Sequence, residues 1–141
     1  MFKKKRKETK TINSCQVIIP ISHPNPPEPH EVDVAMILAR HYQCTVEFLI
    51  PVDDYKRKTA DIVMLGVAWE IKSPLGASKS TIGNQFQFAT KQSRSIILDT
   101  RRTKLAYDDI VKKVLFEINK RSSIKRVVLI DKSGVVVEIK K

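Results

Sequence analysis

The sequence lacks the features of membrane-spanning and secreted proteins. No run of residues approaches the roughly eighteen apolar residues of a transmembrane helix. The lysine-rich segment 3–7 is not followed by the apolar stretch of a secretory signal. The 141 residues are enough for one domain with a sizeable core. We therefore expect a cytoplasmic protein with a basic, flexible tail at residues 1–14 and a single domain at residues 15–141.

Cysteine, histidine and aromatic residues are few. The two cysteines, Cys15 and Cys44, have no C-x-x-C spacing, and the three histidines fall into no ligand spacing. This argues against a disulfide framework and a zinc site, and we expect buried, reduced thiols. Aromatic residues make up 6% of the chain and do not alternate with basic residues, which argues against a module that binds single strands by stacking.

Acidic residues are outnumbered, with 15 Asp and Glu against 26 Lys and Arg, for a formal net charge of +11. Six basic residues and Glu8 within residues 1–10 account for +5 of this charge. Such a tail is equally consistent with a solubilising arm. The remaining excess favours a polyanionic partner, and nucleic acid more than a membrane, because no strongly amphipathic basic helix is evident.

Apolar periodicity predicts a mixed α/β fold, with a central mixed β-sheet flanked by helices. Glu31 stands in the first turn of the first expected helix, where an acid suits the helix dipole and a purely structural role is plausible. Helices are expected at 31–42, from Ser80 or Thr81 to about 93, and at 107–120, and strands at 17–21, 46–52, on both sides of a turn within 61–72, and at 95–99, 126–130 and 135–139.

The segment from Asp61 to Lys72 has the most informative pattern. Two short apolar strands meet at Leu65 and Gly66, and a two-residue turn there pairs Asp61 with Glu70. Because side chains alternate along a strand, Glu70 and Lys72 share one face, and Asp61 joins them across the ladder. Like charges opposite each other on an apolar sheet are unfavourable unless a cation lies between them. The pair is therefore a candidate site for a hard divalent metal.

The ligand types in this segment suit phosphodiester hydrolysis. Magnesium prefers oxygen ligands, which Asp61, Glu70 and the backbone carbonyl of Ile71 supply. A hard cation stabilises charge on the transferring phosphate and acidifies a bound water. Lys72 is placed to position the attacking water, to help deprotonate it or to neutralise the intermediate. The bare E-x-K pattern is also common on solvated strands, where it forms a simple salt bridge.

Glu31, Asp61 and the run Glu70-Ile71-Lys72 resemble the PD-(D/E)xK phosphodiesterase superfamily, whose fold is the restriction-endonuclease-like core. The wider pattern is similar to the tRNA-nuclease toxin domain at the C-terminus of contact-dependent growth-inhibition proteins. The residues that carry this second resemblance lie at 69–76, 81–85, 91–93 and 96–99. The resemblance covers roughly residues 29–102, and its most specific part is the block E-I-K-S-P that begins at Glu70.

The resemblance implies a metal-dependent endonuclease. Asp61 and Glu70 would bind Mg²⁺ or Mn²⁺, Lys72 would be the catalytic lysine, and Glu31 would be the helix acid that completes the site. RNA, and tRNA in particular, is favoured by the resemblance alone, and a protein immunity partner follows from the toxin likeness. Two alternatives stay open: a resolvase-like DNA-processing nuclease of the same superfamily, and a non-catalytic nucleic-acid-binding protein.

The resemblance also implies contacts with the substrate. Lys91 and Gln92 would lie near the substrate phosphate, and Ser73 directly follows the catalytic lysine in the same block. Arg101 and the basic segment 56–58 are reasonable phosphate contacts beside such a site. Solvated loop charge is the equally weighted alternative for these basic residues.

Overall fold

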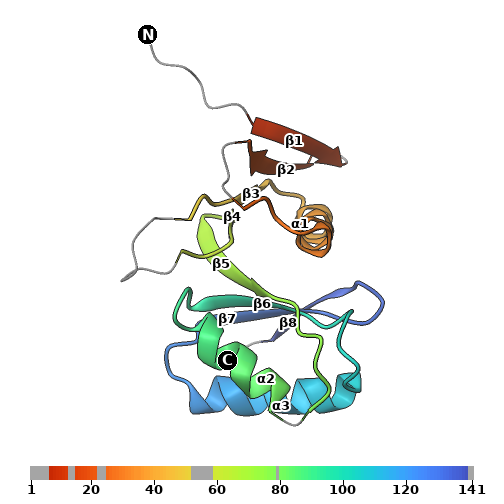
Figure 1. Cartoon of the computed structure of the whole chain (residues 1–141), viewed down its shortest axis with the longest axis vertical. Helices are drawn as coiled ribbons and strands as arrows, with labels where there is room; N and C mark the ends of the chain where they lie inside the picture. Colours follow the sequence, from red (N-terminus) through yellow and green to blue (C-terminus); the bar gives the residue numbers. More distant parts are fainter. Residues whose placement is uncertain (1–6, 13–14, 22–24, 52–58, 79, 140–141) are drawn as a thin grey trace. The chain divides into compact units, whose positions relative to one another are not determined.

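The computed structural model describes residues 7–12, 15–21, 25–51, 59–78 and 80–139. The chain divides into two compact units, Met1–Ala68 and Trp69–Lys141, where the sequence predicts one domain over residues 15–141. Each unit contains strands of a mixed β-sheet together with helix (Figure 1). No helix in the described part of the chain is long and apolar enough to cross a membrane.

Among its described residues, the N-terminal unit contains one helix and strands β1 to β4. Strands β1 and β2 are antiparallel, β2 and β3 parallel, and β3 and β4 antiparallel. The helix α1 packs against β2 and β3 and buries Val34, Ala35, Leu38 and Ala39. The bounds are β1 Lys7–Ile12, β2 Cys15–Pro20, α1 Pro29–Tyr42, β3 Val46–Phe48 and β4 Ile62–Met64.

Strand β1 differs from the sequence-based expectation of a flexible tail at residues 1–14. It pairs with β2 over its whole length, from Lys7 opposite Pro20 to Ile12 opposite Cys15. Residues 1–6 and 13–14 lie outside the described residues. A polar strand of this kind is held by backbone hydrogen bonds to its neighbour, and composition alone is a weak guide to it because strand propensity depends on context.

Helix α1 begins at Pro29, earlier than the predicted start at Glu31. Proline is favoured at the first helical position because it lacks the N–H that would have no helical partner. The carboxylate of Glu31 then accepts a hydrogen bond from the backbone N–H of Glu28, with 3.1 Å between N and Oε1. This bond is half of a capping box, so Glu31 has the structural role that its position in the first turn predicts.

The predicted two-residue turn between the strands of segment 61–72 is confirmed. Leu65 has φ 54° and Gly66 has φ 72°, and both angles are positive, as a type I′ turn requires. Strand β4 ends directly before the turn, and β5, Val67–Lys72, follows it. The pairing of Asp61 with Glu70 stays a prediction.

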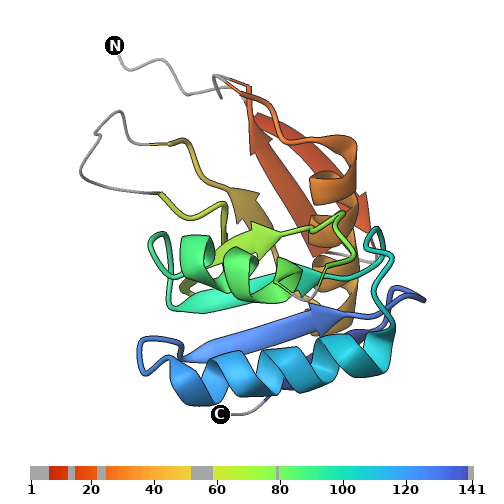
Figure 2. The ribbon, with the colours of Figure 1, turned by 60° about the horizontal axis from the view of Figure 1, so that its bottom comes forward.

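The C-terminal unit consists of two helices on one side of its strands. Strands β5, β6 and β7 are parallel neighbours, and β8 runs antiparallel to β7. Both helices lie on the same face of these strands (Figure 1 and Figure 2). Their apolar residues, among them Phe86 of α2 and Val114 of α3, form a core with Ile96, Leu98 and Leu129. The bounds are α2 Thr81–Ala89, β6 Ser95–Asp99, α3 Tyr107–Lys120, β7 Arg126–Ile130 and β8 Val136–Ile139.

Most elements of the C-terminal unit confirm the sequence-based prediction. Helix α3 and strand β7 have the expected bounds, whereas α2 ends at Ala89 instead of near residue 93. The hydroxyl of Thr90 donates to the carbonyl of Gln87 over 3.2 Å, and the N–H of Gln92 donates to the carbonyl of Ala89 over 2.9 Å. These bonds tighten the chain into a turn and end the helix. The mixed α/β fold with helices flanking the sheet is confirmed.

Candidate active site

Strand β5 brings Glu70 and Lys72 together, as the alternation of side chains predicts. Glu70 lies opposite Ile96 of β6 and is 1% exposed. The Nζ of Lys72 lies 3.2 Å from Oε2 of Glu70, and the lysine side chain is 22% exposed. The pair therefore places a buried carboxylate next to a cation that still reaches solvent, at the carboxyl end of a sheet strand.

Gln92 provides a second oxygen for the same lysine. Its Oε1 accepts a hydrogen bond from Nζ of Lys72 over 3.5 Å. The sequence predicts Gln92 on the edge of helix α2. Because the helix ends early, at Ala89, Gln92 lies instead in the turn that follows it. Lys72 is thus oriented by two acceptors from separate elements.

A buried acid, Asp99, connects the next predicted residues. The hydroxyl of Ser73 donates to Oδ2 of Asp99 over 3.3 Å. Arg101 donates from Nε to Oδ1 over 2.8 Å and from Nη2 to Oδ2 over 3.0 Å. Asp99 is 0% exposed, so the planar guanidinium forms a two-point, charge-assisted pair with an acid that is removed from solvent.

Asp99 is the residue of this cluster to which the sequence assigns no role. A signal for it exists, because an acid that directly follows the apolar run Ile96-Ile97-Leu98 ends a buried strand at the edge where Lys72 also lies. Sequence periodicity identifies the strand, but it does not show that the acid is buried or that Ser73 and Arg101 both bind it.

The loop after β5 is held in place by the loop after β6. The hydroxyl of Thr103 donates to the carbonyl of Gly76 over 2.5 Å, and Nζ of Lys132 donates to the carbonyl of Thr103. A Cβ at position 76 would lie 2.7 Å from Oγ1 of Thr81, so any larger residue at this close approach would force the threonine side chain to shift. These contacts fix the backbone that continues from Lys72.

Glu31 and Asp61, the other two predicted acids, line one cavity of the N-terminal unit. The cavity has a volume of about 270 Å³ and also borders on Glu28 and Phe48. The backbone of Asp61 is fixed by the hydrogen bond that its carbonyl accepts from the N–H of Leu49 over 2.8 Å. The structure thus brings these two acidic residues to the lining of one cavity, and Glu31 also caps α1.

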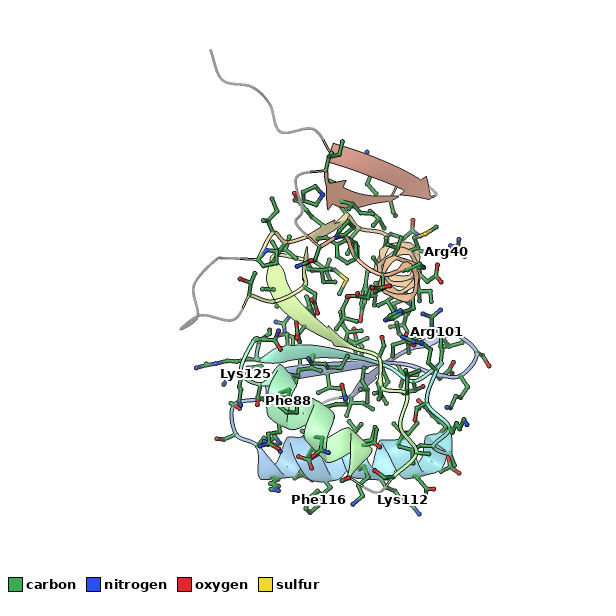
Figure 3. All side chains as sticks on the ribbon, viewed as in Figure 1. Arg40, Phe88, Arg101, Lys112, Phe116 and Lys125 are labelled. Carbon is green, nitrogen blue, oxygen red and sulfur yellow. The ribbon has the colours of Figure 1, made fainter. Side chains whose placement is uncertain are left out.

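The basic residues predicted to contact phosphate have different surroundings. Lys91 is exposed, and its Nζ lies 5.4 Å from the ring centroid of Phe88 on α2. Arg101 projects from the loop after β6, where it binds Asp99 (Figure 3). The basic segment 56–58 lies outside the described residues.

The donor atoms of the predicted ligands are oxygens, which fit a hard divalent cation. Within the C-terminal unit they are the carboxylate of Glu70 and the carbonyl of Ile71, and within the N-terminal unit they are the carboxylates of Glu31 and Asp61. Among the described residues, no group of three or more His, Cys, Asp or Glu side chains is arranged to hold a metal ion. The remaining ligands of such a cation would be backbone carbonyls, water or substrate oxygens.

Comparison with known proteins identifies similar sequences and a similar fold. The family described as "Contact-dependent growth inhibition CdiA C-terminal domain" has a model that matches residues 58–136, a span that includes Asp61, Glu70 and Lys72 and excludes Glu31. A solved structure, "CdiA-CT/CdiI toxin and immunity complex from Burkholderia pseudomallei", is similar with a TM-score of 0.63 and 17% identity. The match covers 84% of this chain and 96% of that chain. At this identity the likeness shows the fold alone, and no curated protein matches the chain.

Proposed function

Because the chain belongs to the contact-dependent growth inhibition CdiA C-terminal domain family, we propose that it is a toxin domain that hydrolyses phosphodiester bonds in RNA, with tRNA as the substrate. The formal net charge of +11 suits a polyanionic substrate. The choice of tRNA rests on the resemblance of residues 69–76 and 91–93 to the tRNA-nuclease toxin domain. The proposed chemistry is that of the PD-(D/E)xK phosphodiesterases.

The observation on which the proposal depends most is the pairing of Glu70 with Lys72. A carboxylate that is almost fully buried beside a partly exposed ammonium group, 3.2 Å away, is an arrangement more typical of a reaction site than of a solvated strand face. Gln92 adds an orienting hydrogen bond to the same ammonium group. The span matched by the family model contains all three residues.

We assign the proposed metal ligands by their donor chemistry. Glu70 and the carbonyl of Ile71 would hold Mg²⁺ or Mn²⁺, and the sequence pattern adds Asp61 as a ligand and Glu31 as the supporting acid. A divalent ion bound to such oxygens supplies charge stabilisation on the transferring phosphate and acidifies a bound water.

Lys72 has two tasks in the proposed reaction. Its ammonium group, held by Glu70 and Gln92, positions the attacking water by donating a hydrogen bond to the water oxygen, and the proton of the water leaves to solvent. The same positive charge lowers the energy of the pentavalent phosphorane, which has more negative charge on its oxygens than the ground state. An arginine at this position would keep the charge but not the compact geometry of a single ammonium group.

Four residues are proposed to face the substrate. Lys91 supplies an exposed cation for a phosphate, and Gln92 lies next to the catalytic lysine. Ser73 and Arg101 also bind the buried Asp99, so they shape the loop after Lys72 as well as border on the substrate.

A protein partner belongs to the same proposal. The similar solved structure from Burkholderia pseudomallei is a toxin and immunity complex, and we propose a cognate immunity protein for this chain as well. Such a partner would protect the cell that makes the toxin. The toxin would act in the cytoplasm, which contains the tRNA of the inhibited cell.

The test is a cleavage assay on bulk tRNA, single-stranded DNA and linear duplex DNA, with Mg²⁺ or Mn²⁺ and with EDTA. We expect tRNA cleavage that EDTA abolishes and that falls at least about a hundredfold in Glu70→Gln and Lys72→Ala, since each change removes charge stabilisation in the transition state. Glu117→Gln is the matched control, because Glu117 is also buried at 4% exposure and paired with an arginine, with 2.6 Å between Oε2 and Nε of Arg121.

Other outcomes separate the alternatives. Cleavage of DNA but not of tRNA would support the proposed active site and would replace tRNA with DNA as the substrate, as in a DNA-processing nuclease. Retention of tRNA in EDTA, with no cleavage under any condition and equal behaviour of Glu70→Gln and Glu117→Gln, would favour a non-catalytic binding protein.

A further inference from the structure

The outer side of helix α3 presents an exposed aromatic ring among lysines. Phe116 is 56% exposed. The Nζ atoms of Lys113 and Lys120 lie 5.8 Å and 5.7 Å from its ring centroid. Phe116 and Lys112 project from the same side of α3 (Figure 3). The proposed active site uses none of these residues.

A cavity of about 630 Å³ lies beside this ring in the C-terminal unit. This volume is within the range of small-molecule and cofactor sites. The lining combines the apolar side chains Ile82, Leu105 and Phe116 with the charged side chains Asp109, Lys112 and Lys113. We refer to it as the α3 cavity.

Helical spacing brings the α3 residues of this cavity to one side. Asp109, Lys112, Lys113 and Phe116 stand at positions i, i+3, i+4 and i+7, which face the same way on an α-helix. Basic and aromatic residues do not alternate along the sequence, and the composition alone therefore predicts that a stacking surface is absent. On α3, Lys112 and Lys113 stand beside Phe116, which is the arrangement of basic and aromatic side chains that a stacking surface needs.

The chemistry of the α3 cavity matches an unpaired nucleotide. Unstacked bases of single-stranded RNA stack on aromatic side chains, and lysines neutralise the flanking phosphates. A carboxylate accepts a hydrogen bond from the exocyclic amino group of cytosine, adenine or guanine, which uracil lacks. We propose that the α3 cavity binds an unpaired base with an exocyclic amino group in an RNA strand, with the base on Phe116, its amino group on Asp109 and its phosphates on Lys112 and Lys113.

An acidic protein segment is the main rival occupant. It would suit Lys112 and Lys113, but its carboxylates would meet the carboxylate of Asp109 in the same cavity. Like charges at short range are unfavourable, so the mixed lining favours a nucleotide, which has both an amino group and a phosphate. The inference rests on the proposed function only in taking RNA as the substrate.

The test measures binding without cleavage. Fluorescence anisotropy in EDTA would give the dissociation constants of labelled oligo(C), oligo(A) and oligo(U) for the full chain. We expect Phe116→Ala, and also Phe116→Leu, which keeps apolar bulk, to weaken oligo(C) and oligo(A) binding about tenfold through lost stacking. Phe88→Ala is the matched control, because Phe88 is 54% exposed with a lysine over its ring and does not line the cavity.

Two further variants test the polar contacts. Asp109→Asn should reduce the preference for oligo(C) and oligo(A) over oligo(U), because an amide is a weaker acceptor than a carboxylate. Lys113→Ala should lower the slope of log K against log[salt] by about 0.7, the value for one phosphate of a single strand. A melting temperature for each variant separates lost contacts from lost folding.

Several results would overturn the inference. The first is that Phe116→Ala and Phe88→Ala bind oligo(C) with equal affinity, and the second is that Asp109→Asn keeps the base preference of the unaltered chain. The third is that an acidic peptide binds more tightly than oligo(C). The fourth is that free CMP displaces labelled oligo(C) at the same concentration as unlabelled oligo(C). The test separates this inference from the proposed nuclease activity. A chain that binds oligo(C) but never cleaves keeps the α3 cavity and loses the nuclease proposal. A chain that cleaves, but whose Phe116→Ala and Phe88→Ala variants bind oligo(C) equally, keeps the nuclease proposal and loses the α3 cavity.

Discussion

Arg101 holds the buried carboxylate of Asp99 by two hydrogen bonds from one guanidinium group, of 2.8 Å and 3.0 Å. The backbone N–H of Arg101 adds a third over 3.1 Å, and the hydroxyl of Ser73 a fourth over 3.3 Å. The acid at the end of β6 therefore connects the loop that follows Lys72 with the loop that contains Arg101.

The first prediction concerns stability. Arg101→Ala should lower the free energy of unfolding by about 3 kcal/mol, because it leaves the fully buried Asp99 carboxylate without its ionic partner. Arg102→Ala, at the exposed neighbouring position, should change it very little. Urea denaturation of both variants measures the difference. Equal stability of the two variants, together with a raised KM for Arg101→Ala, would assign Arg101 to the substrate alone.

The second prediction separates the two roles of Glu31. Glu31→Gln keeps an acceptor for the N–H of Glu28 and should retain stability, whereas Glu31→Ala loses the capping bond and should cost about 1 kcal/mol. If Glu31 is the supporting acid of the metal site, both variants should cleave tRNA more slowly and need more Mg²⁺. Wild-type metal dependence in Glu31→Gln would remove Glu31 from the site and leave it as a cap.

The third prediction concerns the turn at Leu65 and Gly66. Leu65 has φ 54° and is 55% exposed, so burial of its side chain does not offset the strain of its left-handed backbone conformation. Leu65→Asn should raise the free energy of unfolding by about 1 kcal/mol, because asparagine tolerates this conformation. Leu75→Asn is the matched control: Leu75 is 59% exposed and is not among the described residues with positive φ. Thermal denaturation that moves equally in both variants would contradict the argument.

The fourth prediction concerns the thiol of Cys44. Burial raises the pKa of this thiol above its ordinary value, and the neighbouring Cys15 raises it further. Folding thus favours the protonated thiol, and the resulting stabilisation is complete below the pKa of the unfolded thiol and is lost as pH rises through the folded pKa. In a Cys15→Ala background, which isolates the larger effect of burial, the pH midpoint of iodoacetamide reaction with Cys44 should lie higher in the folded chain than in urea. A lower midpoint in the folded chain would indicate an activated thiol instead.

Local pattern was enough to predict several elements and one part of the site. Helix α3 has apolar residues at i, i+3 and i+4 spacing, and its observed bounds are the predicted ones. Glu70 and Lys72 are two residues apart on one strand, so alternation alone predicts that they meet, and their atoms lie 3.2 Å apart. Both results depend only on neighbours in the chain.

Features that depend on distant partners were not predicted. Strand β1 has little apolar content of its own and forms by pairing with β2. The end of α2 at Ala89 was also not predicted, although the turn hydrogen bonds that end the helix join residues only three positions apart. Asp99 acquires its role from Ser73, which is 26 residues away in the chain.

The sequence by itself determined the strands and helices with clear periodicity, the two-residue turn at Leu65 and Gly66, and the chemical types of the candidate site residues. Tertiary structure alone decided that Gln92 reaches Lys72, that Asp99 is buried under Arg101, and that Phe116 borders on a cavity with Asp109. The physical reason is that periodicity reports which face of an element is apolar, whereas the order of strands and the ends of helices determine which faces meet.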